Sequence, residues 1–188
     1  MTVSDTGARE SGIENVAVVF DGSHCDRLRK ALALSIRFEE LVSRLVHPHR
    51  LARAVYYKDL RDEAERKGQA ALLMRVASSG IAVKGSLPED MRIDSRERYG
   101  TNLVELAVET LTNCENLDRV ILFAGDRKQV PLVRALQDRG IRVVVTTALD
   151  VPTAIRASPL LLDTADEYRD LSDYLVSNFQ RHRAKGFE

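Results

Sequence analysis

Two aspartates follow apolar runs that have the composition of buried strands. Asp21 comes directly after Val16–Phe20, and Asp126 comes two residues after Arg119–Ala124. If these strands lie side by side, the two carboxylates meet at one edge of a sheet, where they could hold Mg²⁺. Such an ion could activate a water and stabilise the charge that develops on a phosphodiester. Either aspartate alone could instead cap the next helix, but the matched pair favours a metal and catalytic site.

Four further polar residues adjoin these aspartates. Ser23 and His24 follow Asp21 at the start of a predicted helix, where they could contact a ligand. Arg127 and Lys128 follow Asp126 directly. The lysine could pair with one of the aspartates or hold a phosphate. All four are therefore candidate binding residues.

The helix expected at residues 101–113 presents polar residues along one face. Asn102, Glu105 and Glu109 are spaced i, i+3 and i+7, which places them on the same side of a helix. Glu109 is expected on a solvated surface. Asn102 and Glu105 lie at the head of the helix, so they are candidate catalytic residues, and a solvated face is the equal alternative.

Hydrophobic periodicity predicts strands that alternate with helices. Strands are expected at 16–20, 51–57, 81–86, 119–124 and 141–147. Helices are expected at 25–46, 59–78, 101–113, 130–139 and 166–179, with a short helix near Thr153. This order indicates βαβ units around a parallel sheet of about five strands. Ligands of such sheets bind beyond the carboxyl ends of the strands, near the point where strand order reverses.

Composition narrows the class of protein. The 188 residues are 44% hydrophobic and 30% charged, which is typical of one folded domain. Lys+Arg and Asp+Glu both total 28, so the formal net charge is zero. This balance argues against broad electrostatic adhesion to nucleic acid or membranes, although local charged patches can still bind them. Two cysteines and no secretion signal or membrane span indicate the cytoplasm. No glycine-rich nucleotide motif is present. We expect a flexible arm at 1–14, a domain at 15–180 and a basic tail at 181–188.

Four segments carry a resemblance to a known family: VAVVFDGSH, LARAVYYKDL, RYGTNLVELAVETL and DRVILFAGDRKQVPLVRALQDRGIRVVV. They resemble the NYN domain family, in particular its LabA-like branch, within the PIN-like nuclease superfamily. The likeness runs in order from about Val16 to about Tyr174, and its most specific part is GD-x-x-x-x-PLVRAL. The resemblance implies a Rossmann-like three-layer α/β/α sandwich. For active members it implies endoribonuclease activity that depends on Mg²⁺ or Mn²⁺ held by clustered acids.

The chain departs from the family pattern at three positions. Asp21 and Asp126 match acids of the family, but His24 stands where asparagine is usual. Asn102 stands in place of an aspartate near the head of the third helix, and Lys128 in place of a second aspartate after the fourth strand. Because the alignment of that helix is uncertain by one residue, Glu105 could supply the missing carboxylate.

Two hypotheses follow from this pattern. In the first, the protein cleaves RNA through Asp21 and Asp126 with help from Glu105 or Asn102. An ammonium a few ångströms from Mg²⁺ is repulsive by on the order of several kcal/mol at an effective dielectric of about 20, so Lys128 counts against this use of metal. In the second, a non-catalytic module binds RNA, a nucleotide or a protein partner through Lys128, Arg127 and His24. A homodimer is compatible with such a fold.

Overall fold

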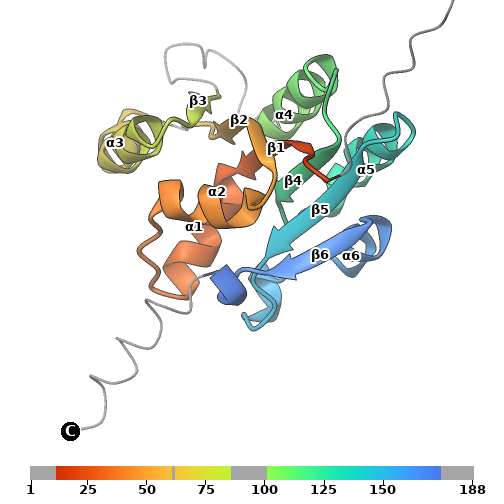
Figure 1. The fold of residues 1–188 in the computed structure, drawn as a ribbon. Coiled ribbons are helices and arrows are strands. Elements are labelled where there is room, and N and C mark those ends of the chain that lie inside the picture. The colour runs from red at the N-terminus through yellow and green to blue at the C-terminus, as the bar shows by residue number, and fades with distance from the viewer. Residues whose placement is uncertain (1–11, 61, 86–100, 175–188) are drawn as a thin grey trace, which may run out of the picture.

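The computed structural model describes residues 12–60, 62–85 and 101–174. Its centre is a six-stranded sheet in the order β3-β2-β1-β4-β5-β6, in which every neighbouring pair is parallel (Figure 1). The strands are β1 (Asn15–Asp21), β2 (Arg50–Tyr57), β3 (Ala82–Lys84), β4 (Arg119–Phe123), β5 (Arg142–Thr147) and β6 (Glu167–Asp170). The predicted parallel α/β sheet is thereby confirmed, with one strand more than expected.

Helices cover both faces of the sheet (Figure 1). One face carries α1 (Gly22–Ala31), α2 (Phe38–Val46) and α3 (Glu63–Ser78), and the other carries α4 (Thr101–Thr112), α5 (Val130–Gln137) and α6 (Pro159–Thr164). The 3₁₀ turns η2 (Arg127–Gln129) and η3 (Thr153–Ile155) follow β4 and β5. No helix in the described ranges is long and apolar enough to cross a bilayer. The three-layer sandwich is therefore confirmed.

Strand β1 supplies both hydrophobic cores because its side chains alternate between the two faces. Val18 and Phe20 pack into the core under α1, α2 and α3. Ala17 and Val19 pack into the core under α4, α5 and α6. The ring of Phe20 also stacks on that of Phe123, with centroids 5.0 Å apart. This contact joins β1 and β4 one residue before β1 ends in Asp21.

The order of the strands reverses at β1. Chain order runs outward from β1 through β2 to β3 on one side, and from β4 to β6 on the other. Strand β1 pairs with β4 in parallel, with Phe20 opposite Phe123. The expected adjacency of the strands that precede Asp21 and Asp126 is confirmed, and these residues lie where ligands of open α/β sheets bind.

The helix predicted at residues 25–46 is instead two helices. Helix α1 ends at Ala31 and α2 begins at Phe38. Between them Ala33 has a φ of 48°, a left-handed conformation that interrupts a right-handed helix. The apolar spacing runs through the break because Leu32, Leu34 and Ile36 also pack against the core, so periodicity alone concealed it.

The helix predicted at residues 166–179 is wrong in its described part, where Glu167–Asp170 forms β6. This strand pairs with β5 at the edge of the sheet, opposite Val144–Thr147. Its sequence EYRD has no buried residue, since an edge strand does not require the apolar run of a central one. Residues 175–180, the basic tail at 181–188 and most of the predicted arm lie outside the described residues.

A buried ion-pair network connects the end of β2 to two helices. Lys58 follows β2, and its side chain is 9% exposed. Its ammonium lies 3.1 Å from Asp26 of α1 and 3.3 Å from Glu65 of α3. Asp26 also accepts hydrogen bonds from Arg29 and from Gln69 of α3. The network therefore fixes α1 and α3 relative to the carboxyl end of β2.

Candidate functional site

Asp21 is the buried centre of the candidate site. It is the last residue of β1 and the N-cap of α1, where its Oδ1 accepts hydrogen bonds from the backbone N–H groups of Ser23 (3.0 Å) and His24 (3.3 Å). Only 2% of its surface is exposed. Burial raises the pKa of its carboxyl, and the charge of Asp126 adds to that rise, while the backbone hydrogen bonds and Arg27 oppose it.

Gln129 also binds Asp21. Its Nε2 donates to Asp21 Oδ2 at 3.4 Å, and its side chain comes from η2, so it connects the ends of β1 and β4. Both oxygens of Asp21 therefore already accept hydrogen bonds from the protein. The Oε1 atom of Gln129 is buried and has no hydrogen-bond partner among the residues that the structure describes.

The ring of His24, which follows β1, contacts the ends of β4 and β5. Its Nε2 lies 2.9 Å from Thr147 Oγ1 at the end of β5. A Cβ on Gly125, after β4, would lie 2.3 Å from the ring, so only glycine fits there without a shift. Burial lowers the pKa of His24 to about 4, helped by the charge of Arg27. His24 is therefore neutral at neutral pH and packs inside the site, while its role as a ligand contact stays a prediction.

The lowered pKa of His24 predicts a pH-dependent stability. The unfolded state binds the imidazole proton at a pKa near 6.5 and the folded state at about 4. The unfolded state therefore holds more protons in that window, and stability is lost as pH falls through it. We expect His24→Gln to reduce the loss of unfolding free energy between pH 7 and pH 4 by about 3 kcal/mol. Urea denaturation of both proteins at each pH measures it.

Asp21 is retained in both proteins of that comparison. Its raised pKa acts in the opposite direction, because the folded state gains protons as pH falls. The difference between the two proteins therefore isolates His24. A difference that stays constant between pH 7 and pH 4 would contradict a buried neutral imidazole.

Asp126 is more accessible than Asp21. It is partly exposed and forms the N-cap of η2, where its Oδ1 accepts the backbone N–H of Lys128 at 2.9 Å. Its charge raises the pKa values of both Asp21 and His24. The two aspartates of the predicted pair thus lie close enough to influence each other, and each also caps the helical turn that follows it.

Helix α4 brings Asn102 to this edge but places Glu105 elsewhere. The backbone N–H of Asn102 donates to Asp59 Oδ2 at 2.8 Å. Its buried Nδ2 has no hydrogen-bond partner in the described part of the chain. Glu105 is exposed and lines a separate groove with Tyr57 and Glu109. It is not among the groups with the largest influence on the pKa of Asp21, and its catalytic role stays a prediction.

The site opens to solvent at the carboxyl edge of the sheet, and this opening is called the mouth. Three cations lie around it. Arg27, on the first turns of α1, is exposed, and its charge acts on both Asp21 and His24. Arg127 and Lys128 of η2 are also exposed. Within the described residues the ammonium of Lys128 pairs with neither aspartate, and its contact with Asp126 is made by its backbone N–H. The accessible charge at the mouth is therefore mainly positive.

The residues at the mouth do not suit a divalent cation. The best-placed carboxylate, Asp21, is buried and accepts three hydrogen bonds from the protein. Hard ions require carboxylate oxygens that are free to coordinate them. No group of three or more His, Cys, Asp or Glu that could hold a metal occurs in the ranges 12–60, 62–85 and 101–174. Arg27, Arg127 and Lys128 would repel the ion further.

Sequence reasoning missed four residues of this site. Gln129 binds Asp21, and Thr147 binds His24. Asp59 accepts a backbone N–H at the start of α4, and Arg27 supplies the third cation. Arg27 lies three residues after His24 and so on the same helix face, a signal that was present. The other three depend on which strand ends meet, which requires the topology.

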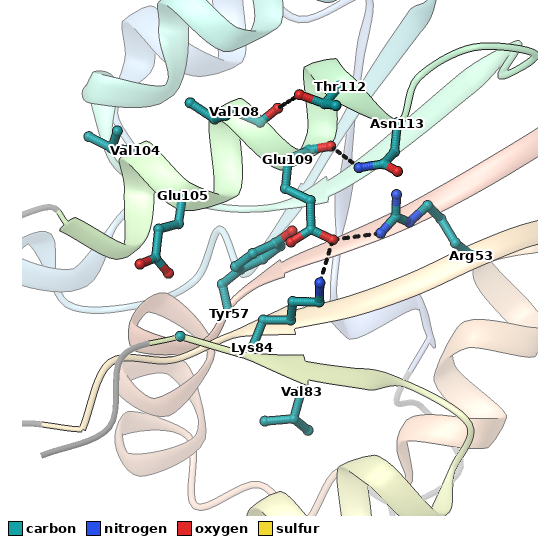
Figure 2. Close-up of a pocket in the computed structure, with 11 residues that line it drawn as sticks. Arg53, Tyr57, Val83, Lys84, Val104, Glu105, Val108, Glu109, Thr112 and Asn113 are labelled. Atoms are coloured by element: carbon teal, nitrogen blue, oxygen red, sulfur yellow. Dashed lines mark hydrogen bonds and ion pairs between the residues drawn. The ribbon is translucent and has the colours of Figure 1, made fainter. Parts of the chain in front are cut away.

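A groove of about 850 Å³ lies beside α4 and the β2–β3 side of the sheet (Figure 2). At its centre Arg53 donates to Glu109 Oε1 at 2.8 Å, and the ammonium of Lys84 lies 3.0 Å from the same oxygen. Burial alone would raise the pKa of Glu109, but hydrogen bonds from Tyr57, Lys84 and Arg53 outweigh it and hold the pKa below its usual value. Glu109 is therefore partly exposed in an open groove, and it is paired there with two cations rather than hydrated alone.

Comparison with known proteins identifies a family and a fold. A model described as the NYN domain matches residues 15–172. A crystal structure of a protein of unknown function from Vibrio parahaemolyticus RIMD 2210633 superimposes with a TM-score of 0.67 and 20% identity, covering 88% of this chain and 98% of that one. An oxidoreductase from Sinorhizobium meliloti gives a TM-score of only 0.36 at 13% identity, over 87% of this chain and 38% of that one. No curated protein matches.

Proposed function

The chain belongs to the NYN domain family, and on this premise we propose that it binds RNA at the carboxyl edge of its sheet without metal-dependent cleavage. The LabA-like branch and a cytoplasmic location are parts of the same proposal. The family supplies the substrate class, since the resemblance implies RNA. The charges at the mouth supply the mode of binding.

One observation carries the proposal: the acid at the centre is buried while the cations around it are exposed. Asp21 is 2% exposed and accepts three hydrogen bonds from the protein, so its carboxylate is shielded from a ligand. Arg27, Arg127 and Lys128 are exposed, and such side chains bind phosphate oxygens through charge-assisted hydrogen bonds. A polyanion is therefore favoured at this mouth over a hydrated Mg²⁺ or Mn²⁺.

The buried side-chain amides of Gln129 and Asn102 offer further hydrogen-bonding atoms at this edge of the sheet. Gln129 Oε1 and Asn102 Nδ2 have no partner in the described ranges, and an unpaired buried polar atom costs about 1–3 kcal/mol. A ligand or an ordered water that bonds to them would recover part of this free energy. We infer that the amides contact the bound nucleotide, with Ser23 at the rim of the same edge.

A metal-dependent endoribonuclease is the competing function. The specific observation in its favour is that the charge of Asp126 acts on the pKa of Asp21, since the two residues follow the paired strands β1 and β4. In that case Asn102 would be the third member of the site. The two functions differ in whether bound RNA is cut.

A cleavage assay distinguishes them. Purified protein is incubated with mixed single-stranded RNA and Mn²⁺ or Mg²⁺, beside an Asp126→Ala control. The proposal predicts intact RNA with both proteins and a retained complex with the wild type in a gel-shift experiment. Cleavage that disappears in Asp126→Ala would establish the nuclease and overturn the proposal, as would the absence of any complex.

A further inference from the structure

We propose that the groove beside α4 is a second phosphate subsite, in which Arg53 and Lys84 hold a phosphate of the RNA strand bound at the mouth. This inference rests on the proposed function and extends it, because the RNA strand would then contact two separate sites on the protein.

Among the described residues, two cations and one carboxylate meet at the centre of the groove. Arg53 and Lys84 both bind the same oxygen of Glu109, at 2.8 Å and 3.0 Å (Figure 2). Tyr57 hydrogen-bonds to Glu109 as well, and burial together with that carboxylate raises the pKa of its hydroxyl, which stays neutral. Two positive charges therefore share one negative charge, and the pair can bind an additional anion.

Both cations can be reached from solvent. The side chains of Lys84 and Arg53 are 48% and 28% exposed. Guanidinium and ammonium groups carry more N–H donors than a single carboxylate oxygen can accept. Since Glu109 also holds both side chains in place, an anion that bridges them meets donors that are already ordered.

The rest of the groove suits the remainder of a nucleotide. Val83, Val104 and Val108 line it and are 37%, 62% and 59% exposed, which offers apolar contact to a sugar or base. Glu105 lines the same groove, and Figure 2 shows its carboxylate apart from the point where Arg53, Lys84 and Glu109 meet. Its negative charge opposes a phosphate, so its removal should strengthen binding.

The groove reaches the same edge of the sheet as the mouth through Lys84. Lys84 ends β3 as Asp21 ends β1, and Tyr57 lies opposite both residues in the register. From that edge the groove runs back along β2 to Arg53, which lies opposite Ala17. Three strand spacings of about 4.8 Å separate β3 from β4, so Lys84 lies roughly 14 Å from the β4 side of the mouth across the sheet. A single strand of a few nucleotides spans that distance, whereas a very short oligonucleotide occupies one site only.

Fluorescence anisotropy with a dinucleotide and with single-stranded RNA of about 16 nucleotides, the upper end of the usual range of site sizes, tests the path. Lys84→Gln should weaken binding of the longer RNA by about tenfold and leave the shorter unchanged. Glu105→Gln should strengthen binding of the longer RNA roughly threefold, a direction that misfolding cannot produce. Lys30→Gln, an exposed residue at the far end of α1, is the matched control.

The outcomes separate this inference from the proposed function. If Lys84→Gln and Glu105→Gln both behave like Lys30→Gln while Lys128→Gln weakens both RNAs, the groove is not a subsite and the mouth still binds. If Lys128→Gln has no effect either, the proposed function itself fails. Titration with inorganic phosphate alone forms the other arm. Suppose that phosphate binding is saturable and that Lys84→Gln removes it without any effect on RNA binding. This result would overturn the proposal that one RNA strand occupies both the groove and the mouth.

Discussion

Replacement of Arg127 and Lys128 together by glutamate is expected to weaken RNA binding by on the order of 100-fold, because each lost hydrogen bond between charged groups contributes about 1.5–3 kcal/mol. The two carboxylates would add repulsion beside Asp126. The slope of log affinity against log salt concentration should also decrease in magnitude by about two, since about one counterion is released per phosphate contact. Anisotropy at several salt concentrations measures both quantities.

The fold should tolerate this double substitution. Both side chains are exposed, and the capping contact of Lys128 with Asp126 uses a backbone N–H. Lys30→Glu with Arg139→Glu is the matched control, because it reverses two exposed charges away from the carboxyl edge. An affinity and salt slope equal to those of this control would contradict the assignment of the mouth as the RNA site.

Lys58→Met is expected to lower the free energy of unfolding by about 3 kcal/mol, because removal of the cation of a buried ion pair leaves its carboxylate partners with less compensating charge. Asp26 and Glu65 have side chains only 7% and 13% exposed, and both lie within 3.3 Å of the Lys58 ammonium. The lower end of the usual range applies because Arg29 and Gln69 still hydrogen-bond to Asp26.

Urea denaturation measures this effect against a matched variant. Lys67 lies on α3 with a side chain that is 77% exposed and an ammonium 3.8 Å from Glu63. An exposed pair of this kind contributes at most about 1 kcal/mol, so Lys67→Met should leave the midpoint nearly unchanged. Equal losses in the two variants would show that the buried network does not fix α1 and α3.

Much of the fold followed from the sequence because its central strands are continuous apolar runs. Val16–Phe20 and Arg119–Ala124 are buried on both faces. The first is followed by Asp21 and the second by Gly125 and Asp126, so the strands and their ends could both be predicted. The strand at Glu167–Asp170 was not, because an edge position relaxes the demand for apolar side chains. The break at Ala33 was concealed by apolar residues that pack on both sides of it.

The site was predictable to the extent that it depends on strand order. The pairing of β1 with β4 brought Asp21 and Asp126 to one edge as expected. The hydrogen bond between Gln129 and Asp21 and the contact between His24 and Gly125 depend on side-chain packing across that edge, which no spacing along the chain encodes. For the same reason the spacing along the helix did not reveal that Glu105 and Glu109 line one groove.

The central claim is that the mouth holds RNA through cations rather than through a divalent ion. The affinity of the wild-type protein for a single-stranded RNA, measured by anisotropy in EDTA and again in Mn²⁺, tests it most directly. The account predicts the same affinity in both conditions, apart from the modest weakening that any added salt produces. Binding that appears only with Mn²⁺ would contradict it.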